Sequence, residues 1–99
     1  MLENGVDVNY SFDSRPMITI AAMFSQLETV ELLLTYGAKV NDIDGSGVTP
    51  LMFAAREGNV EMVTYLLEKG ANKSLREIRN ETAADMVKDN EELKKMLQF

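Results

Sequence analysis

The 99-residue sequence contains no cysteine, no histidine and no tryptophan. Without cysteine it cannot form a disulfide, a thiolate nucleophile, an iron–sulfur cluster or a cysteine-ligated zinc site. Without histidine it lacks the commonest general base and the commonest imidazole ligand, so a Ser–His–Asp triad cannot be assembled. These absences argue against an enzyme. We expect no catalytic residue, no cofactor and no bound metal.

Positive charge and long apolar runs are also scarce. Lys and Arg total 10 against 16 Asp and Glu, which gives a net charge of -6. Such a surface repels phosphate, so nucleic acid and anionic membranes are not expected partners. No stretch approaches the roughly 20 apolar residues of a membrane span, and the first residues lack the features of a signal peptide. We therefore expect one small domain in the cytoplasm or nucleus.

The sequence repeats itself with a period of about 33 residues, which indicates a repeat architecture. Displacement by this period takes Ala21-Ala22 onto Ala54-Ala55 and Gly37-Ala38 onto Gly70-Ala71. Further coincidences pair Glu28 with Glu61, Val30 with Val63, Leu33-Leu34 with Leu66-Leu67, and Thr49 with Thr82. A displacement shorter by one places Gly5, Val8 and Asn9 on Gly37, Val40 and Asn41.

Each repeat has the pattern of two short helices. Thr49 is a suitable N-cap and Pro50 a suitable first helical residue, so a helix is predicted to run to about Glu57 and to end at Gly58. A second helix is predicted over about 60–69, before the next glycine. Because each pair is too small to bury its apolar face alone, stability should come from stacking. The predicted core includes Phe53, Ala54, Ala55 and the leucine pairs.

The preceding repeat varies this pattern. Its helices are predicted over about 17–24 and 27–36, and Ser25-x-x-Glu28 is typical of a capping box for the second. Pro16-Met17-Ile18 replaces Thr-Pro-Leu, which leaves open a shift of the first helix start by one residue.

The most regular segment resembles the ankyrin repeat. It reads Asp44-x-x-Gly47-x-Thr49-Pro50-Leu51-x-x-Ala54-Ala55-x-x-Gly58-x-x-Glu61-x-Val63-x-x-Leu66-Leu67-x-x-Gly70-Ala71. Residues 80–86 resemble the start of the first helix of a terminal capping repeat, and 90–98 resemble its final helix. Met52 stands where the family usually has histidine, so we expect the polar network of that histidine to be absent. The resemblance implies an all-α solenoid of stacked antiparallel helix pairs joined by β-turn or hairpin-like loops.

The resemblance also divides the chain. Within one domain over 1–99, it implies a remnant of a first repeat over 1–9, repeats over 10–42 and 43–75, and a capping repeat over 76–99. The remnant leaves the helices of 17–36 without the one and a half helices that should cover them. We therefore expect a piece of a longer array, or an end that pairs with something, because an exposed apolar face usually marks an interface.

Two short motifs favour structural interpretations over ligand sites. Gly45-Ser46-Gly47 lacks the later glycine of a phosphate-binding loop and is interpreted as a turn. Asp42-x-Asp44 opens like a calcium loop, but its twelfth position is Phe53 and not a bidentate glutamate. The two acids are interpreted as a solvated edge.

The resemblance implies a non-catalytic protein–protein interaction module. Ankyrin repeats commonly bind partners through turn tips and the exposed side of the first helix. The matching positions are Phe12, Asp13, Arg15, Met23, Phe24 and Tyr36 in one repeat, Gly45, Ser46, Val48, Arg56, Glu57 and Lys69 in the next, and Ile78, Arg79, Glu81 and Asp89 in the last.

The aromatic residues of this set have two interpretations. Phe12, Phe24 and Tyr36 suit interface anchors, whereas Phe24 and Met23 could instead pack under the missing helices. The acidic charge favours a protein partner with a basic patch. The alternative function is a structural segment of a longer array that self-associates, as a homodimer, through its uncapped N-terminal face.

Overall fold

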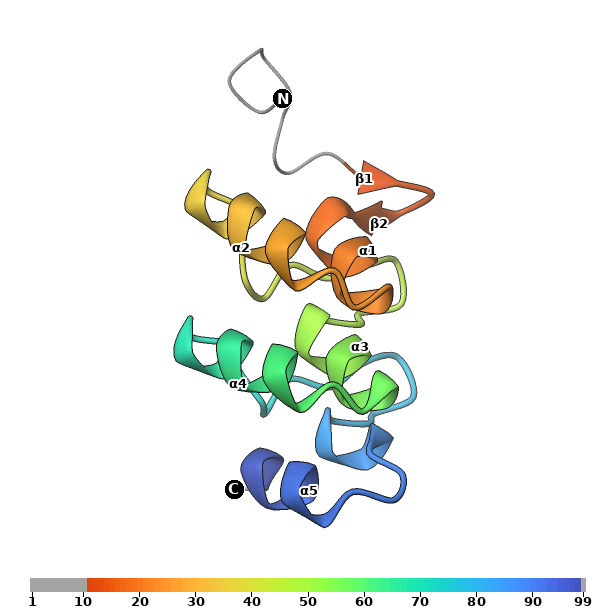
Figure 1. The fold of residues 1–99 in the computed structure, drawn as a ribbon. Helices are drawn as coiled ribbons and strands as arrows, with labels where there is room; N and C mark the ends of the chain where they lie inside the picture. Colours follow the sequence, from red (N-terminus) through yellow and green to blue (C-terminus); the bar gives the residue numbers. More distant parts are fainter. Residues whose placement is uncertain (1–10, 99) are drawn as a thin grey trace.

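The computed structural model describes residues 11–98, and short helices stacked in pairs dominate them (Figure 1). The elements are β1 (Ser11–Phe12), β2 (Arg15–Pro16), α1 (Met17–Met23), α2 (Leu27–Thr35), α3 (Pro50–Glu57), α4 (Val60–Glu68), the 3-10 helix η2 (Ala84–Met86) and α5 (Glu91–Leu97). The strands are two residues each and form the arms of one hairpin-like loop. The predicted helical solenoid is therefore confirmed.

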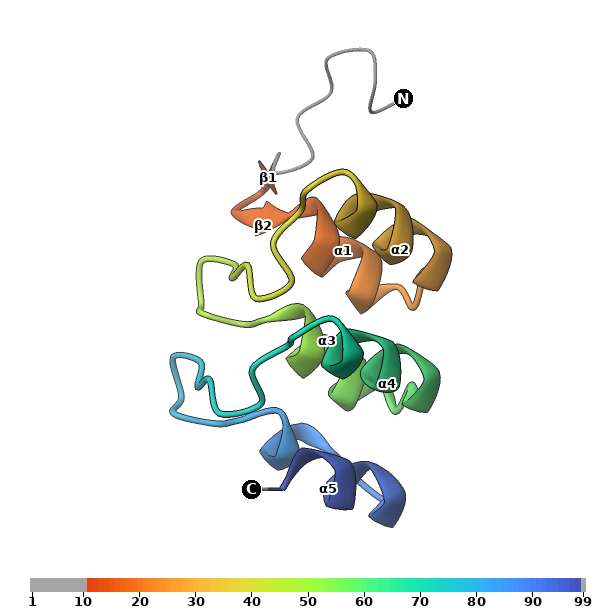
Figure 2. The same cartoon turned by 90° about the vertical axis from the view of Figure 1, so that its left-hand side faces the viewer.

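The helix pairs stack along one axis. α1 packs against α2 and α3, and α3 packs against α4 and η2, so the first helices of successive units form one layer (Figures 1 and 2). The centre of the stack is apolar: Ile18, Ala22, Leu51, Ala54 and Leu66 are at most 1% exposed. Of the predicted core, Phe53, Ala54, Ala55, Leu33 and Leu66 are buried, and Leu34 and Leu67 are half-buried.

Helix α3 begins with the predicted cap. The Thr49 hydroxyl accepts a hydrogen bond from the Met52 backbone N–H at 3.2 Å, and Pro50 occupies the first turn. The Thr49 backbone N–H in turn donates to the Met52 thioether sulfur at 3.4 Å. At the position where the family usually has histidine, Met52 thus supplies one weak sulfur acceptor.

The preceding unit starts in register but connects its helices differently from the prediction. α1 begins at Met17, the equivalent of Pro50, so the helix start does not shift. The Ser25-x-x-Glu28 capping box is wrong, since α2 has Gln26 at its N-cap and no side-chain cap. Ser25 instead has φ +58°, where Gly58 has φ +73°. It occupies the left-handed turn after α1 and so cannot adopt the extended conformation of an N-cap.

The segment predicted to be a capping repeat has the expected final helix, but its first helix is shorter than expected. Asn90 caps α5 through a hydrogen bond from the Leu93 N–H, as predicted for residues 90–98. The segment over 80–86 forms only the single turn η2, after which Val87 is extended. Asn90 follows Thr82 by eight positions, whereas Asn59 follows Thr49 by ten. The connection is therefore too short for a two-turn helix and a reversal.

The helix pairs α1–α2 and α3–α4 fall within the predicted repeats 10–42 and 43–75, although the repeat boundaries themselves stay a prediction. The remnant over 1–9 lies outside the described residues.

We expect reciprocal effects from exchanging the residues of the two helix-to-helix turns. Ser25→Gly should stabilise the protein by about 0.5–1 kcal/mol and Gly58→Ser should destabilise it by a similar amount, because only glycine adopts this conformation without strain. A Cβ at Gly58 meets no atom within 4 Å, so backbone strain alone is tested. Urea unfolding measures the free energy of unfolding of both variants. If both substitutions changed it in the same direction, the assignment of Ser25 and Gly58 to the same left-handed turn would be contradicted.

Leu66→Ala should destabilise the fold by about 2–5 kcal/mol, because Leu66 is fully buried on α4 and its loss leaves a cavity. Thermal and denaturant unfolding followed by circular dichroism measure the change. Leu32→Ala, at a leucine that is 47% exposed on α2, is the control and should change stability by less than about 1 kcal/mol. Indistinguishable melts for the two variants would contradict the stacked core.

Candidate functional site

Three loop tips project from the same side of the stack, which is the left-hand side of Figure 2. We name them finger 1 (residues 11–16), finger 2 (44–48) and finger 3 (77–81). In finger 1, Phe12 pairs with Arg15 across the strands, and the two residues between them, Asp13 and Ser14, have φ values of +56° and +65°. Two central residues with positive φ form a type I′ turn, which suits the twist of a hairpin.

Fingers 2 and 3 are each organised by one carboxylate. Asp44 Oδ1 accepts hydrogen bonds from the backbone N–H groups of Ser46 at 2.8 Å and Val48 at 2.9 Å. Its side chain is only 8% exposed, so the interpretation of Asp44 as part of a solvated edge is wrong. Glu77, at the equivalent position one repeat later, accepts from the N–H groups of Arg79 at 2.6 Å and Glu81 at 3.2 Å. Both carboxylates thereby satisfy backbone donors that the turns leave unpaired.

Backbone hydrogen bonds connect neighbouring fingers. The Gly45 N–H donates to the Ser14 carbonyl at 3.0 Å, and the Ile78 N–H donates to the Ser46 carbonyl at 2.9 Å. Arg15 Nε also lies 3.9 Å from Asp44 Oδ2. Gly47, with φ +80°, allows the tight turn between these contacts, as predicted for this glycine-rich segment. The tips therefore form a continuous row in which adjoining loops hold each other in place.

Finger 3 contains an ion pair with a buried carboxylate. Arg79 Nε lies 3.0 Å from Glu77 Oε2, and the Glu77 side chain is 2% exposed. Burial alone would raise the pKa of Glu77, but the hydrogen bonds from the Arg79 guanidinium and from the backbone N–H groups of Glu81 and Arg79 hold that pKa below its ordinary value of 4.5. The same pairing raises the pKa of Arg79. The contacts of finger 3 therefore favour the ionised form of Glu77.

A groove joins finger 1 to the exposed side of α1. It has a volume of about 290 Å³ and is lined by Phe12, Asp13, Arg15, Ile20, Met23 and Phe24. Five of these six residues were predicted from the sequence as partner-facing, and the structure brings them together. Phe12 and Phe24 are 65% and 64% exposed, so two phenyl rings stand largely in solvent at the edge of the groove.

The other predicted residues lie outside this groove. Gly45, Ser46, Ile78, Arg79 and Asp89 are exposed, and Glu81 is partly exposed. Val48 is half-buried and packs against the core. Arg56 and Glu57 are exposed at the end of α3, where the Arg56 guanidinium lies 4.7 Å from the centre of the Phe53 ring. Tyr36 and Lys69 follow the ends of the second helices and are exposed.

Three residues that shape the site were missed by sequence reasoning. Ile20 lines the groove, while Asp44 and Glu77 organise the fingers. The signal for the two acids was present, since both precede a turn and occupy equivalent positions of successive repeats. Ile20 is one turn before Phe24 on the same helix face, which is a signal for a shared surface once the helix is known.

Within residues 11–98, no three acidic, histidine or cysteine side chains gather where they could hold a metal ion. In the same part of the chain, none of the helices is long and apolar enough to cross a membrane.

We predict that Glu77→Gln destabilises the protein at neutral pH and that this difference shrinks as the pH falls. Because the folded-state pKa of Glu77 is depressed, its contribution is present above about pH 4.5 and is lost as pH falls through the lower folded value. Unfolding curves at pH 7 and pH 3 measure it. Glu91→Gln, an exposed carboxylate on α5, controls for the loss of one negative charge. A pH-independent difference would contradict the role of the ionised carboxylate.

Comparison with known proteins agrees with this architecture. The family model described as "Ankyrin repeats (3 copies)" matches residues 1–77. Similar proteins include BRCA1-associated RING domain protein 1 of Caenorhabditis elegans, which is 35% identical over 98 residues, or 98% of this chain and 14% of that protein. Ankyrin repeat and KH domain-containing protein mask-1 of the same organism is 35% identical over 77 residues, which are 77% of this chain and 3% of that protein. A putative ankyrin repeat protein of Borreliella burgdorferi is 30% identical over 73 residues, which are 74% of this chain and 33% of that protein.

The chain thus spans a third or less of the length of these curated relatives. Ankyrin repeats are in general modules of protein–protein interaction and are in general not catalytic. The family match covers most of the chain, and the paired helices, the bonded fingers and the period of the sequence agree with it. The chain belongs to the ankyrin-repeat family.

Proposed function

We propose that this chain binds another protein through the groove between finger 1 and α1, with fingers 2 and 3 extending the contact surface. The observation that supports the proposal is that Phe12, Met23 and Phe24 line the same groove. Two charged side chains, Asp13 and Arg15, line it beside them. Apolar and aromatic anchors in a concave site, with a few polar groups to fix orientation, are the usual composition of a recognition site.

Rigidity supports this proposal. The fingers are bonded to each other through Gly45 and Ile78, and the groove wall formed by α1 stands on a buried core. A surface that is already ordered loses little conformational entropy when a partner docks, so more of the contact energy is available for affinity. The anchor side chains are therefore presented by a frame that does not need to form on binding.

Electrostatics favours a basic partner. The chain has a net charge of -6, which raises its rate of encounter with a protein that carries a basic patch. In the groove, Asp13 and Arg15 can pair with charges on the partner, although Arg15 already lies 3.9 Å from Asp44. The partner segment we propose therefore carries an apolar or aromatic side chain for the groove and basic residues beside it.

We predict that Phe12→Ala and Met23→Ala each weaken binding by about tenfold or more, equivalent to about 1.4 kcal/mol, because buried apolar anchors dominate interface energies. Binders are first selected from a displayed peptide library on the immobilised chain, and their affinities for the parent and the variants are then measured by fluorescence anisotropy. Neither variant removes a fully buried side chain, so both should remain folded.

Leu32→Ala is the matched control, since Leu32 is 47% exposed on α2 and does not line the groove. Its affinities should equal those of the parent. Selection that yields no specific binder, or binders whose affinity depends on Leu32 and not on Phe12 or Met23, would overturn the proposed surface.

A further inference from the structure

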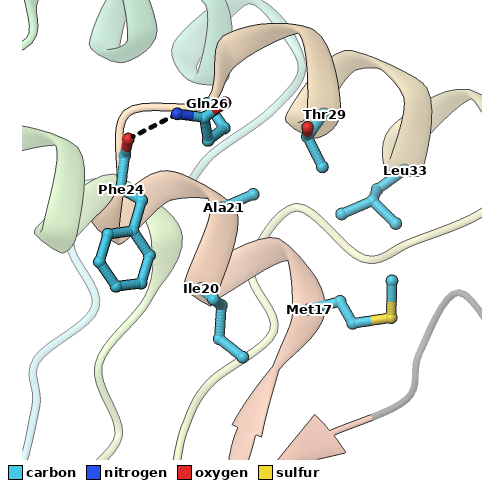
Figure 3. A pocket seen from close by; sticks show the side chains of 7 residues that line it. All are labelled: Met17, Ile20, Ala21, Phe24, Gln26, Thr29 and Leu33. Atoms are coloured by element: carbon cyan, nitrogen blue, oxygen red, sulfur yellow. Dashed lines mark hydrogen bonds between the residues drawn. The ribbon is translucent and has the colours of Figure 1, made fainter.

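The helix pairs carry hollows that differ in charge. One lies on α1 and α2 (Figure 3), and its uncharged lining selects no particular ligand chemistry. Its lining residues are Met17, Ile20, Ala21, Phe24, Gln26, Thr29 and Leu33. Another lies between α2 and α4, the helices that lie away from the finger tips (Figure 2), and we name it the acidic groove. It has a volume of about 410 Å³ and is lined by Leu27, Glu31, Glu61, Thr64, Tyr65 and Glu68.

Helical spacing brings the lining of the acidic groove together. On α2, Leu27 and Glu31 are four residues apart. On α4, Glu61, Tyr65 and Glu68 are separated by four and then by three residues. Side chains at these spacings lie on the same face of a helix. Each helix therefore contributes both apolar and acidic side chains to the groove.

No ion pair within the described residues balances the negative charge of the acidic groove. α2 and α4 contain four glutamates and no lysine or arginine, whereas α5 contains two acidic and two basic residues. The ion pairs of residues 11–98 lie in the fingers or at the end of α3, so none involves Glu31, Glu61 or Glu68. A concave surface lined by charges of one sign attracts ligands of the opposite sign.

The spacing of the carboxylates favours a polypeptide with several positive charges over a single ion. Within residues 11–98, no three acidic side chains are close enough together to hold a metal ion. Glu61 and Glu68 are two helical turns apart, which is about 10 Å along α4. Two basic residues three positions apart in an extended segment span about the same distance.

Tyr65 makes arginine the basic residue that fits best. Its ring is half-buried and packs against the core, so its position is fixed. Lys69 Nζ lies 5.6 Å from the centre of this ring, which shows that a cation can approach it. An arginine guanidinium both stacks on an aromatic ring and forms two parallel hydrogen bonds with a carboxylate. Leu27, on the other helix, offers apolar contact to its methylene groups.

We propose that the acidic groove binds an extended segment of a partner protein in which two arginines, three positions apart, pair with Glu61 and Glu68. One of the two guanidinium groups stacks on Tyr65. This surface shares no residue with the groove at finger 1, so the interaction goes beyond the proposed partner binding.

An NMR titration tests the proposal with a defined probe. The isotope-labelled chain is mixed at low salt with an acetylated and amidated peptide that contains Arg-Leu-Ser-Arg, and the backbone amide signals are followed. The signals of α2 and α4 should shift first and should saturate. A peptide with glutamine in place of both arginines should cause no shift. Shifts centred on the fingers, or spread evenly over the chain, would overturn the proposal.

Matched charge variants separate the groove from general attraction to an acidic protein. Glu61→Gln combined with Glu68→Gln should lower the affinity for the peptide about three- to tenfold. Glu91→Gln combined with Glu92→Gln removes the same charge from exposed positions of α5 and should change the affinity less than twofold. Equal losses for the two pairs would overturn the site. All four glutamates are exposed, so both double variants should remain folded.

Tyr65→Leu tests the aromatic contact without a change in charge. It should lower the affinity for the peptide about two- to fivefold, because a cation–π contact is lost. An unchanged affinity would overturn the stacking on this ring. Displacement of the peptide by calcium at constant ionic strength would identify a metal ion as the occupant and would overturn the proposal. Phe12→Ala should leave the affinity for this peptide unchanged, so the acidic groove and the groove at finger 1 fail independently.

Discussion

The apolar contact between successive helix pairs is the interaction on which the remaining structure depends. The helices are seven to nine residues long, whereas isolated helices shorter than about 12–15 residues are marginal in water. None of them is therefore expected to persist alone. Small side chains at Ala22 and Ala54, both fully buried, allow the first helices to approach one another closely. Stacking thus supplies the stability that helix length does not, and it fixes the spacing of the loops between the helices.

The stack positions the fingers, and hydrogen bonds within each loop give them their shape. Fingers 2 and 3 contain no strand pair, so their backbone donors need other acceptors. Asp44 and Glu77 supply these acceptors in fingers 2 and 3, at the same position of successive repeats. Finger 1 has Ser11 at that position and is held by a strand pair instead. A strand pair in finger 1 and a carboxylate acceptor in fingers 2 and 3 therefore produce loops that project in the same direction. The residues at the tips are free to differ, because neither arrangement depends on them.

Much of the helical layout was predictable, because its signals are local. Thr49, Pro50 and Gly58 mark the ends of α3 through the backbone requirements of their own positions. Predictions failed where one residue fits two local structures: Ser25 suits both a cap and a left-handed turn, and in the structure it has φ +58° and occupies the turn between α1 and α2. Individual residues of the groove were also predictable from the resemblance. Their meeting was not, since Phe12 lies on β1 and Phe24 directly follows α1, and no local sequence signal fixes the angle between these elements.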